Sequence, residues 1–363
     1  MRLNLFRLRS PDWPLLIAMF TLVLFGLAAI YSVELSHATS TFLNVKKQLA
    51  AAGIGILAFL FIASSNYHLL RNYAVVLYAS GVLLMVGVLL FGETVRGTTG
   101  WYSVGPMSFQ PVEYMKLALA VALAAYFSGR ARLEFGLREL FESAGIVGVP
   151  VGLTMLQPDL GSALLLISLW GVVVLFAGIK KLYVLALSAL STLSALLAWK
   201  FLFADYQKAR ILTFLNPAAD PLGQGYNVTQ AIIAVGSGGW FGRGLGFGSQ
   251  SQLKFLPESQ TDFIFAVIAE ELGFIGVVLL FAAFAVLFWR LLGLASRTHD
   301  DFSGYLLIAI GGVLFAQTCV NLGMNLGLLP VTGVALPLVS YGGSSLVFTL
   351  IMVAVAQSVA SRE

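Results

Sequence analysis

The chain has 363 residues, of which 59% are hydrophobic and 10% are charged. Soluble globular domains carry about a quarter charged residues, so the composition excludes that class and predicts a membrane protein with several spans. The 21 lysines and arginines exceed the 17 aspartates and glutamates by too little to indicate a nucleic-acid partner.

Apolar runs separated by charged, proline or glycine residues predict an all-α fold with about ten transmembrane helices. These helices form one integral membrane domain over residues 1–363. The first run follows a basic start, as a signal peptide does, but its length and the spans behind it indicate an uncleaved first span. The approximate predicted spans are 13–31, 47–65, 73–91, 113–128, 142–157, 160–178, 182–203, 263–290, 304–328 and 343–360.

The fifth and sixth spans could also be one long apolar tract, which "QPDLG" (157–161) interrupts. Proline biases the residue before it away from the helix, and an aspartate followed by glycine is typical of a turn. We therefore predict two short spans joined by a tight turn.

The distribution of lysine and arginine predicts that both termini are cytoplasmic, with Lys46 and Lys47 as a local exception. This topology places nearly all the polar sequence on the outer side, in residues 96–116, 157–161, 204–261 and 329–345. The longest of these, 204–261, is an extracytoplasmic loop between the seventh and eighth spans. Because these segments are rich in aromatic residues, glycine and proline, we expect them to be ordered and functional.

Asp262 stands at the start of the eighth span, in "LPESQTDFIFAVIAEELG" (256–273). It has two interpretations, as a cap of the following helix or as a general base that takes a proton from a hydroxyl. Ser259 and Thr261 are alternative caps, which favours the base. Glu270 and Glu271 lie further along the same span, where carboxylates usually face the bundle interior. We predict a structural role for Glu271 and leave Glu270 open.

Glu113 and Lys116 share a helix face at the start of the fourth span and can pair. Either they fix helix packing, or Glu113 holds Lys116 toward an anionic head group. Asp159 in "QPDLG" is a turn residue or an acid in a cavity. In the loop 204–261, Arg210 and Lys254 are solvated charges or a clamp for a diphosphate.

Other kinds of site are disfavoured. The glycine-rich pieces 236–248 and 341–345 lack the context of a phosphate-binding loop, and we predict close helix approach and tight turns there. The single Cys319 excludes a disulfide framework and a cysteine metal site. The scattered His37, His68 and His299 argue against a histidine zinc site.

Four motifs stand out in the outer segments: "GTTGWYSVGPMSFQPVEYMKLAL", "QPDLGSALLL", "NPAADPLGQGYNVTQAIIAVGSGGWFGRGLGFGSQSQLKFLPESQTDFIFAVIAEELGFIG" and "LPVTGVALPLVSYGGSS". They resemble the SEDS family of RodA, FtsW and SpoVE, and the similarity covers the chain from the third predicted span to its end. "LPVTGVALPLVSYGG" (329–343) is closer to RodA than to FtsW, where "PTKG" is usual. Many relatives have histidine in place of Gln260, so a histidine there is not required.

This resemblance implies a ten-span peptidoglycan glycosyltransferase of the bacterial cytoplasmic (inner) membrane, which polymerises lipid II on the outer face. It implies a class B penicillin-binding protein as partner, together with undecaprenyl lipids and other proteins of the elongation complex. The family's catalytic acid falls on Asp262 and its ion pair on Glu113 and Lys116. Further matching positions, without an assigned role, are Trp101, Asp159, Arg210 and Glu258.

The chemistry of such a transfer agrees with one carboxylate. The acceptor hydroxyl needs a base, whereas the leaving undecaprenyl diphosphate is already a stable anion and needs cationic help. That help comes from lysine, arginine or a divalent cation such as Mg²⁺ or Mn²⁺. Two alternatives remain: a flippase or transporter of the same lipid, and a non-catalytic scaffold for the penicillin-binding protein.

Overall fold

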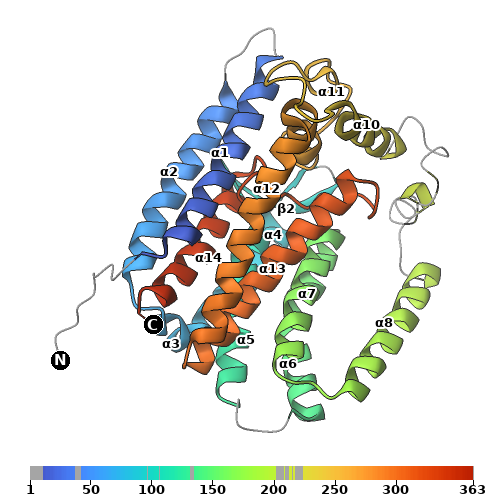
Figure 1. The fold of residues 1–363 in the computed structure, drawn as a ribbon. Helices are drawn as coiled ribbons and strands as arrows, with labels where there is room; N and C mark the ends of the chain where they lie inside the picture. The colour runs from blue at the N-terminus through green and yellow to red at the C-terminus, as the bar shows by residue number, and fades with distance from the viewer. Residues whose placement is uncertain are drawn as a thin grey trace.

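The computed structural model describes residues 11–36, 42–95, 97–105, 107–130, 135–201, 208, 212–214, 216 and 224–362 (Figure 1). The described helices are α1 (Trp13–Leu35), α2 (Leu43–Ser64), α3 (His68–Asn72), α4 (Ala74–Phe91), α5 (Pro111–Ser128), α6 (Leu137–Leu156), α7 (Leu160–Phe176), α8 (Lys181–Phe201), α10 (Gln224–Ser237), α11 (Ser249–Gln252), α12 (Ile264–Arg297), α13 (Asp301–Asn325) and α14 (Gly343–Ala360). The described strands are β1 (Glu93–Val95), β2 (Thr98–Val104) and β3 (Met107–Phe109).

Each of the ten predicted spans falls on one helix. By length and composition, seven helices in the described part of the chain can cross a membrane: α1, α2, α4, α6, α12, α13 and α14. The remaining three spans correspond to α5, α7 and α8. Two of these helices differ from the seven in composition or length. The helix α5 is less apolar because it carries Glu113 and Lys116, and α7 is short, with 17 residues. The predicted turn at 157–161 is confirmed, because α6 ends at Leu156 and α7 begins at Leu160.

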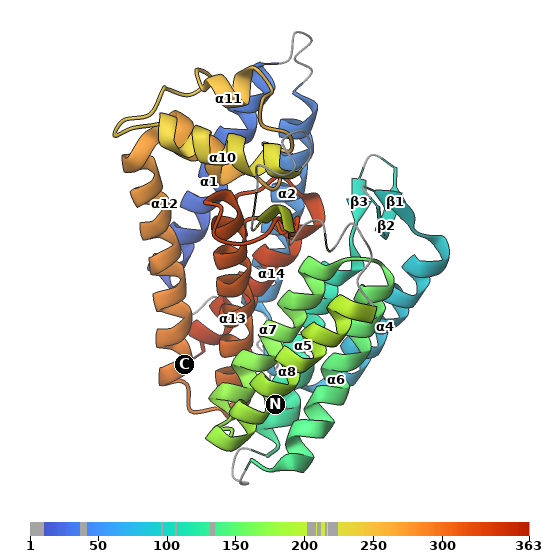
Figure 2. The same ribbon diagram turned by 90° about the vertical axis from the view of Figure 1, so that its right-hand side faces the viewer.

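The long helices stand side by side, and the polar segments cover one end of the bundle (Figures 1 and 2). The helix α2 packs along α14, α1 along α12, and α13 against both α5 and α7. The helix α8 stands apart from the others at its far end (Figure 1). The helices α10 and α11 lie at one end of the bundle, and we call it the outer end by the predicted topology. The C-terminus and α3 lie at the opposite end.

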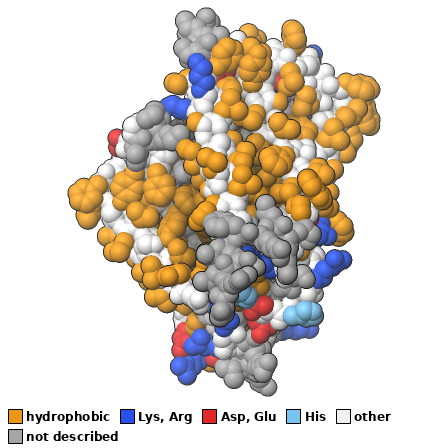
Figure 3. All heavy atoms as spheres, turned by 90° about the vertical axis from the view of Figure 1, so that its left-hand side faces the viewer, with side chains coloured by type: hydrophobic (Ala, Val, Ile, Leu, Met, Phe, Trp, Pro, Cys, Tyr) orange, Lys and Arg blue, Asp and Glu red, His pale blue; other side chains and the backbone are white. Residues whose placement is uncertain are grey.

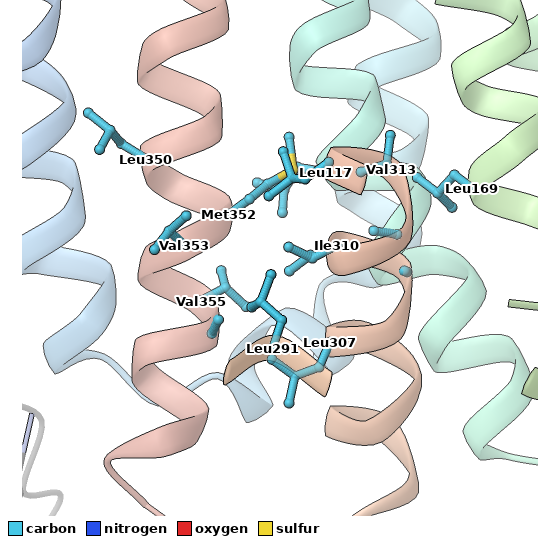
Figure 4. Packing of buried hydrophobic residues seen from close by; sticks show 14 of the residues in the cluster. Leu117, Leu169, Leu291, Leu307, Ile310, Val313, Leu350, Met352, Val353 and Val355 are labelled. Atoms are coloured by element: carbon cyan, nitrogen blue, oxygen red, sulfur yellow. The ribbon is translucent and has the colours of Figure 1, made fainter. Parts of the chain in front are cut away.

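Aliphatic side chains fill the interior between the helices. Leu117 of α5, Ile310 and Val313 of α13, and Met352 of α14 meet where three helices converge (Figure 4). Hydrophobic side chains also cover much of the side of the molecule that Figure 3 shows, whereas charged side chains gather toward the lower end of this view. An apolar belt with charges beyond it is the surface that a bilayer requires.

Two outer segments contain structure that the sequence did not predict. The strands β1, β2 and β3 form a three-stranded antiparallel sheet in the order β1-β2-β3, so the all-α expectation missed one small sheet. The predicted loop 204–261 contains α10, which lies across the outer end of the bundle, and the short α11 (Figure 2).

The eighth span is interrupted near its outer end. Gly273 has a non-helical backbone (φ 65°, ψ −164°) inside α12. The turn at residues 239–244 inserts there: Phe274 N donates to the Gly239 carbonyl at 2.9 Å, and Arg243 N donates to the Glu270 carbonyl at 3.0 Å. A Cβ on Gly273 would lie 2.2 Å from Gly242 N. The predicted close approach of the glycine-rich piece is therefore confirmed.

Candidate functional site

Asp262 lies directly before α12, at the outer end of the bundle. The cap position of α12 is Phe263, whose side chain makes no capping bond, so the structure does not support Asp262 as the cap residue. Its half-buried side chain faces the segment 329–342: Oδ2 lies 3.8 Å from the position of a Cβ on Gly333. Among the described residues, no other atom beyond the chain neighbours of Gly333 lies within 4 Å of that position. On the side of Gly333, the described residues therefore leave room next to the carboxylate.

The residues before Asp262 are fixed by hydrogen bonds to the segment 329–342 and to α2. The Thr261 carbonyl accepts from Ser340 Oγ at 2.6 Å, and the Gln260 carbonyl accepts from Tyr341 N at 2.8 Å. The side-chain oxygen of Gln260 accepts from Asn44 Nδ2 at 2.8 Å. Gln260 thus links the residues before Asp262 to the start of α2.

Tyr341, in the same segment, packs against the hydrophobic core. Burial, with Glu34 nearby, raises the pKa of its hydroxyl further above neutral pH, where a tyrosine is protonated in any case. The carboxylate of Glu34 accepts from Asn44 N at 2.7 Å and so anchors the start of α2. This anchoring keeps the Asn44 side chain within reach of Gln260.

Glu113 and Lys116 form a buried ion pair, as their spacing predicts. Lys116 Nζ lies 2.7 Å from Glu113 Oε2 and donates to Gln317 Oε1 at 2.9 Å. The Lys116 residue is 1% exposed. A charge this deeply buried is tolerated because it is paired and hydrogen-bonded. The geometry favours the packing interpretation over direct contact between Lys116 and a head group.

Asp159 caps α7. Its Oδ1 accepts from Ser162 N at 2.9 Å, and its Oδ2 accepts from Ser162 Oγ at 2.7 Å and from Gln110 Nε2 at 3.4 Å. Next to it, Gly161 packs against the carbonyl of Thr332, in the segment that also borders Asp262. The turn interpretation of Asp159 therefore agrees with the structure, and the segment 329–342 lies between the starts of α7 and α12.

The remaining predicted site residues occupy different surroundings. Trp101 is half-buried in β2, where it pairs with Glu93 of β1. Glu258 is half-buried and accepts from Thr261 Oγ1 at 3.0 Å. Lys254 is exposed and has a left-handed backbone (φ 60°). Arg210 lies outside the described residues.

Glu270 and Glu271 are fully buried, and their carboxylates bind residues of the outer segment rather than line a cavity. Glu270 accepts from Gln250 N at 2.8 Å and from Ser251 N at 3.2 Å, which fixes α11 to α12. Glu271 accepts from Ser32 Oγ at 2.5 Å and from Ser251 Oγ at 3.1 Å. The structural role predicted for Glu271 agrees with these contacts, and Glu270 has a role of the same kind.

Sequence reasoning missed three amides of α13 that contact the site: Gln317, Asn321 and Asn325. Asn321 Nδ2 donates to the Asp262 carbonyl at 3.0 Å, and Asn325 Nδ2 donates to it at 2.9 Å. Their signal in the sequence is a period of four residues within an otherwise apolar span, which places them along one helix face.

In the part of the chain that the structure describes, no three His, Cys, Asp or Glu side chains form a group that could hold a metal ion. Among the described residues, a metal site built from three or more of these side chains is therefore absent. A magnesium ion that binds largely through substrate phosphates needs only one or two protein carboxylates, and Asp262 and Glu258, four residues apart in the chain, are the candidates for this role.

The fold and these contacts define a class of protein: a polytopic helical membrane protein with a carboxylate site at one end of its bundle. The chain belongs to the FtsW/RodA/SpoVE family, described as "Cell cycle protein", whose profile matches residues 13–363. The match also includes the first two spans, which the predicted resemblance left out.

Curated relatives carry the names of different branches of the family. Stage V sporulation protein E of Bacillus subtilis is 39% identical, over 96% of this chain and 97% of that protein. Peptidoglycan glycosyltransferase MrdB of Escherichia coli K12 is 38% identical, over 84% of this chain and 82% of that protein. Because these identities differ so little, a particular closeness to RodA stays a prediction.

Solved structures have the same fold over nearly the whole chain. One, described as "Structural coordination of polymerization and crosslinking by a peptidoglycan synthase complex", has a TM-score of 0.80 and 35% identity, over 96% of this chain and 97% of that chain. The rod shape determining protein RodA of Thermus thermophilus has a TM-score of 0.72 and 31% identity, over 96% of both chains.

Proposed function

We propose that this protein is a peptidoglycan glycosyltransferase that polymerises lipid II on the outer face of the bacterial cytoplasmic membrane. Relatives with this activity in their names match it over most of their length. The observation that carries the proposal is the position of Asp262 at the end of a membrane-spanning helix, where its half-buried carboxylate faces Gly333. A carboxylate at that level can meet a sugar whose lipid tail remains in the bilayer.

In the proposed reaction, Asp262 acts as the general base. Its carboxylate takes the proton of the acceptor 4-hydroxyl as that oxygen attacks the anomeric carbon of the donor sugar. The bond from this carbon to the diphosphate breaks, and undecaprenyl diphosphate leaves with the electron pair. An α-linked donor gives a β-linked product, which is the inversion expected of one direct displacement. Because the leaving group is a stable anion, a second carboxylic acid of the glycosidase kind is not needed.

The proposal assigns separate roles to the other predicted residues. Lys254 and Arg210 are the candidates for contact with the diphosphate, since Lys116 is enclosed by Glu113 and Gln317. Trp101 is a candidate for stacking on a sugar. A divalent cation such as Mg²⁺ or Mn²⁺ stays a prediction; when bound, it would neutralise charge on the diphosphate.

We also propose that the protein works with a class B penicillin-binding protein, which crosslinks the strands, and with other proteins of cell elongation. The support comes from the similar solved complex, whose description joins polymerisation and crosslinking. Undecaprenyl-linked substrates require the membrane, and the apolar belt of the bundle meets this requirement.

The test is glycan synthesis from lipid II by the purified protein together with its penicillin-binding partner. We expect long glycan from the wild type and none from Asp262→Asn, which keeps the size of the side chain. Asp159→Asn serves as the matched carboxylate control and should retain synthesis, because Asp159 caps α7. Equal product from the wild type and Asp262→Asn would move the base to Asp159 or Glu258.

The same variant separates the alternative functions. If the wild type makes no glycan, and lipid II still moves across liposomes with Asp262→Asn, the protein is a flippase. If cells that carry Asp262→Asn keep their normal shape, the protein is a scaffold. Either result would overturn the proposal.

A further inference from the structure

Three amides form a polar stripe along the interior of α13. Gln317, Asn321 and Asn325 are 1%, 0% and 0% exposed, and they recur every four residues. With about 3.6 residues per helical turn, this spacing keeps them on one face, facing the same neighbours. A buried amide costs free energy unless it is hydrogen-bonded, so each of the three must find partners inside the protein.

The inner part of the stripe joins the buried ion pair to the segment 329–342. Gln317 Oε1 accepts from Lys116 Nζ at 2.9 Å, and Gln317 Nε2 donates to the Ala335 carbonyl at 2.9 Å. One turn further out, Asn321 Nδ2 donates to the Val334 carbonyl at 2.8 Å and to the Asp262 carbonyl at 3.0 Å. Asn321 thus fixes the backbone of Asp262 and the neighbouring segment to the same point of α13.

Asn325 fixes the start of α12. Its Nδ2 donates to the Asp262 carbonyl at 2.9 Å, while its Oδ1 accepts from Ala266 N at 3.2 Å. The side chain of Phe263, the cap residue of α12, makes no capping bond, and its carbonyl accepts from Ala266 N at 3.0 Å. An amide can donate and accept at once, so Asn325 adds a side-chain acceptor for the first turn of α12 from another helix and holds the Asp262 peptide with the same group.

We propose that Asn321 and Asn325 are positioning residues for Asp262, and that Gln317 links them to the Glu113–Lys116 pair. This inference rests on the proposed function, because it assigns the stripe a task in the same reaction. A catalytic group must be held within about 0.5 Å of its productive place. The two asparagines do this by holding the peptide that carries the Asp262 side chain, without touching the substrate.

A matched control lies on the same helix. Thr318 is 4% exposed, and its hydroxyl donates to the Leu314 carbonyl of its own helix at 2.8 Å. Thr318→Val removes a buried hydrogen bond of α13 without touching the stripe's partners. A loss of activity due only to a weakened α13 should therefore occur in this variant as well.

The experiment compares Asn321→Leu, Asn325→Leu and Thr318→Val with the wild type in the lipid II assay. Displacement by about 1 Å can lower a rate about a hundredfold, so we expect kcat to fall by that order in both asparagine variants. KM for lipid II should change less than about twofold, because the stripe binds no substrate. The acid limb of the pH–rate profile, which reports the base, should shift in these variants and stay in place in Thr318→Val.

A second measurement does not depend on the reaction. The Asp262 carboxyl is half-buried, and its coupling to an amine by a water-soluble carbodiimide can be followed by mass spectrometry. We expect the labelling rate of Asp262 to change at least about threefold in Asn321→Leu and to match the wild type in Thr318→Val. If the wild type labels normally but makes no glycan, the proposed function fails while the labelling still tests the positioning.

If a leucine variant loses its cooperative melting transition, Asn321→Ser replaces it. A serine hydroxyl can donate one of the two bonds that Asn321 makes, and we expect an intermediate loss of about tenfold in kcat. The proposal is overturned if folded Asn321 and Asn325 variants keep the wild-type kcat, pH profile and labelling rate. It is also overturned if Thr318→Val changes these three quantities as much as they do.

Discussion

Breaking the buried ion pair of α5 from one side should cost much of the protein's stability. Lys116→Met removes the ammonium that lies 2.7 Å from Glu113 Oε2, while Glu113 stays 7% exposed and loses its partner. An uncompensated buried charge costs about 3–5 kcal/mol. The Gln317 oxygen, which accepts from Lys116 at 2.9 Å, loses its donor and adds about 1 kcal/mol. The expected loss is therefore about 4–6 kcal/mol.

The assay is thermal unfolding of the purified protein in one detergent, followed by intrinsic fluorescence. The double variant Glu113→Gln/Lys116→Met removes both charges and should melt close to the wild type, because replacing a buried pair with neutral side chains is often neutral. An exposed pair gives the control: Arg138 Nε lies 2.7 Å from Glu142 Oε1, but the Arg138 side chain is 79% exposed. Arg138→Gln should not change the melting temperature measurably.

The reasoning is refuted if Lys116→Met has the melting temperature of the wild type, because the Glu113 carboxyl would then be solvated or neutral in the folded protein. It is also refuted if the double variant is as unstable as the single one, since the loss would then come from packing. A melting temperature restored in the double variant, with polymerisation still absent, would add a role in the reaction to the structural one.

Two further predictions concern contacts of α12, and a third concerns the charge on the leaving group. Gly273→Ala should lower the free energy of unfolding by about 1–3 kcal/mol, because the backbone of Gly273 has a positive φ and no room for a Cβ. Gly293 lies in open space on the same helix, so Gly293→Ala should not destabilise the protein in the same melting assay. Glu270→Gln should lower the melting temperature, because the hydrogen bond from Gln250 N at 2.8 Å then has a neutral acceptor. The variant should keep most of the polymerase activity at low temperature. Complete loss of activity in folded protein would contradict the structural role of Glu270. A chelator should abolish glycan synthesis by the wild type, and added Mg²⁺ or Mn²⁺ should restore it, because Lys116 is committed to Glu113; full activity in the chelator would rule out a divalent cation.

The features of the fold that depend on local sequence were predictable. Apolar length located all ten long helices, and proline with aspartate and glycine located the turn at 157–161. The ion pair followed from helix geometry, because Glu113 and Lys116 are three residues apart. The strands at 93–109 were missed because they are short and their pairing depends on register, which a sequence without a strong alternating pattern does not specify.

The sequence indicates a candidate site residue where that residue acts through its own chemistry, and not where it acts through a distant partner. Asp262 was singled out because other caps are available beside it and because the family's catalytic acid falls on it, and its role as the base stays a prediction. Asn321 and Asn325 were not singled out, since their partner at Asp262 is about sixty residues away in the chain and amides in a span have many structural uses. The role of Glu270 was left open for the same reason, because the backbone groups from which its carboxylate accepts hydrogen bonds lie in α11.

The insertion of residues 239–244 into the break of α12 sets an order for the protein's assembly in the cell. This turn precedes α12 in the chain, so it leaves the ribosome before the carbonyl of Glu270 and the amide of Phe274 that it binds. If the predicted topology is followed, the outer segment crosses the membrane without these partners and must wait for α12 to enter the bilayer. Translation that stops before Glu270 would therefore leave a translocated loop without the α12 partners that its turn binds.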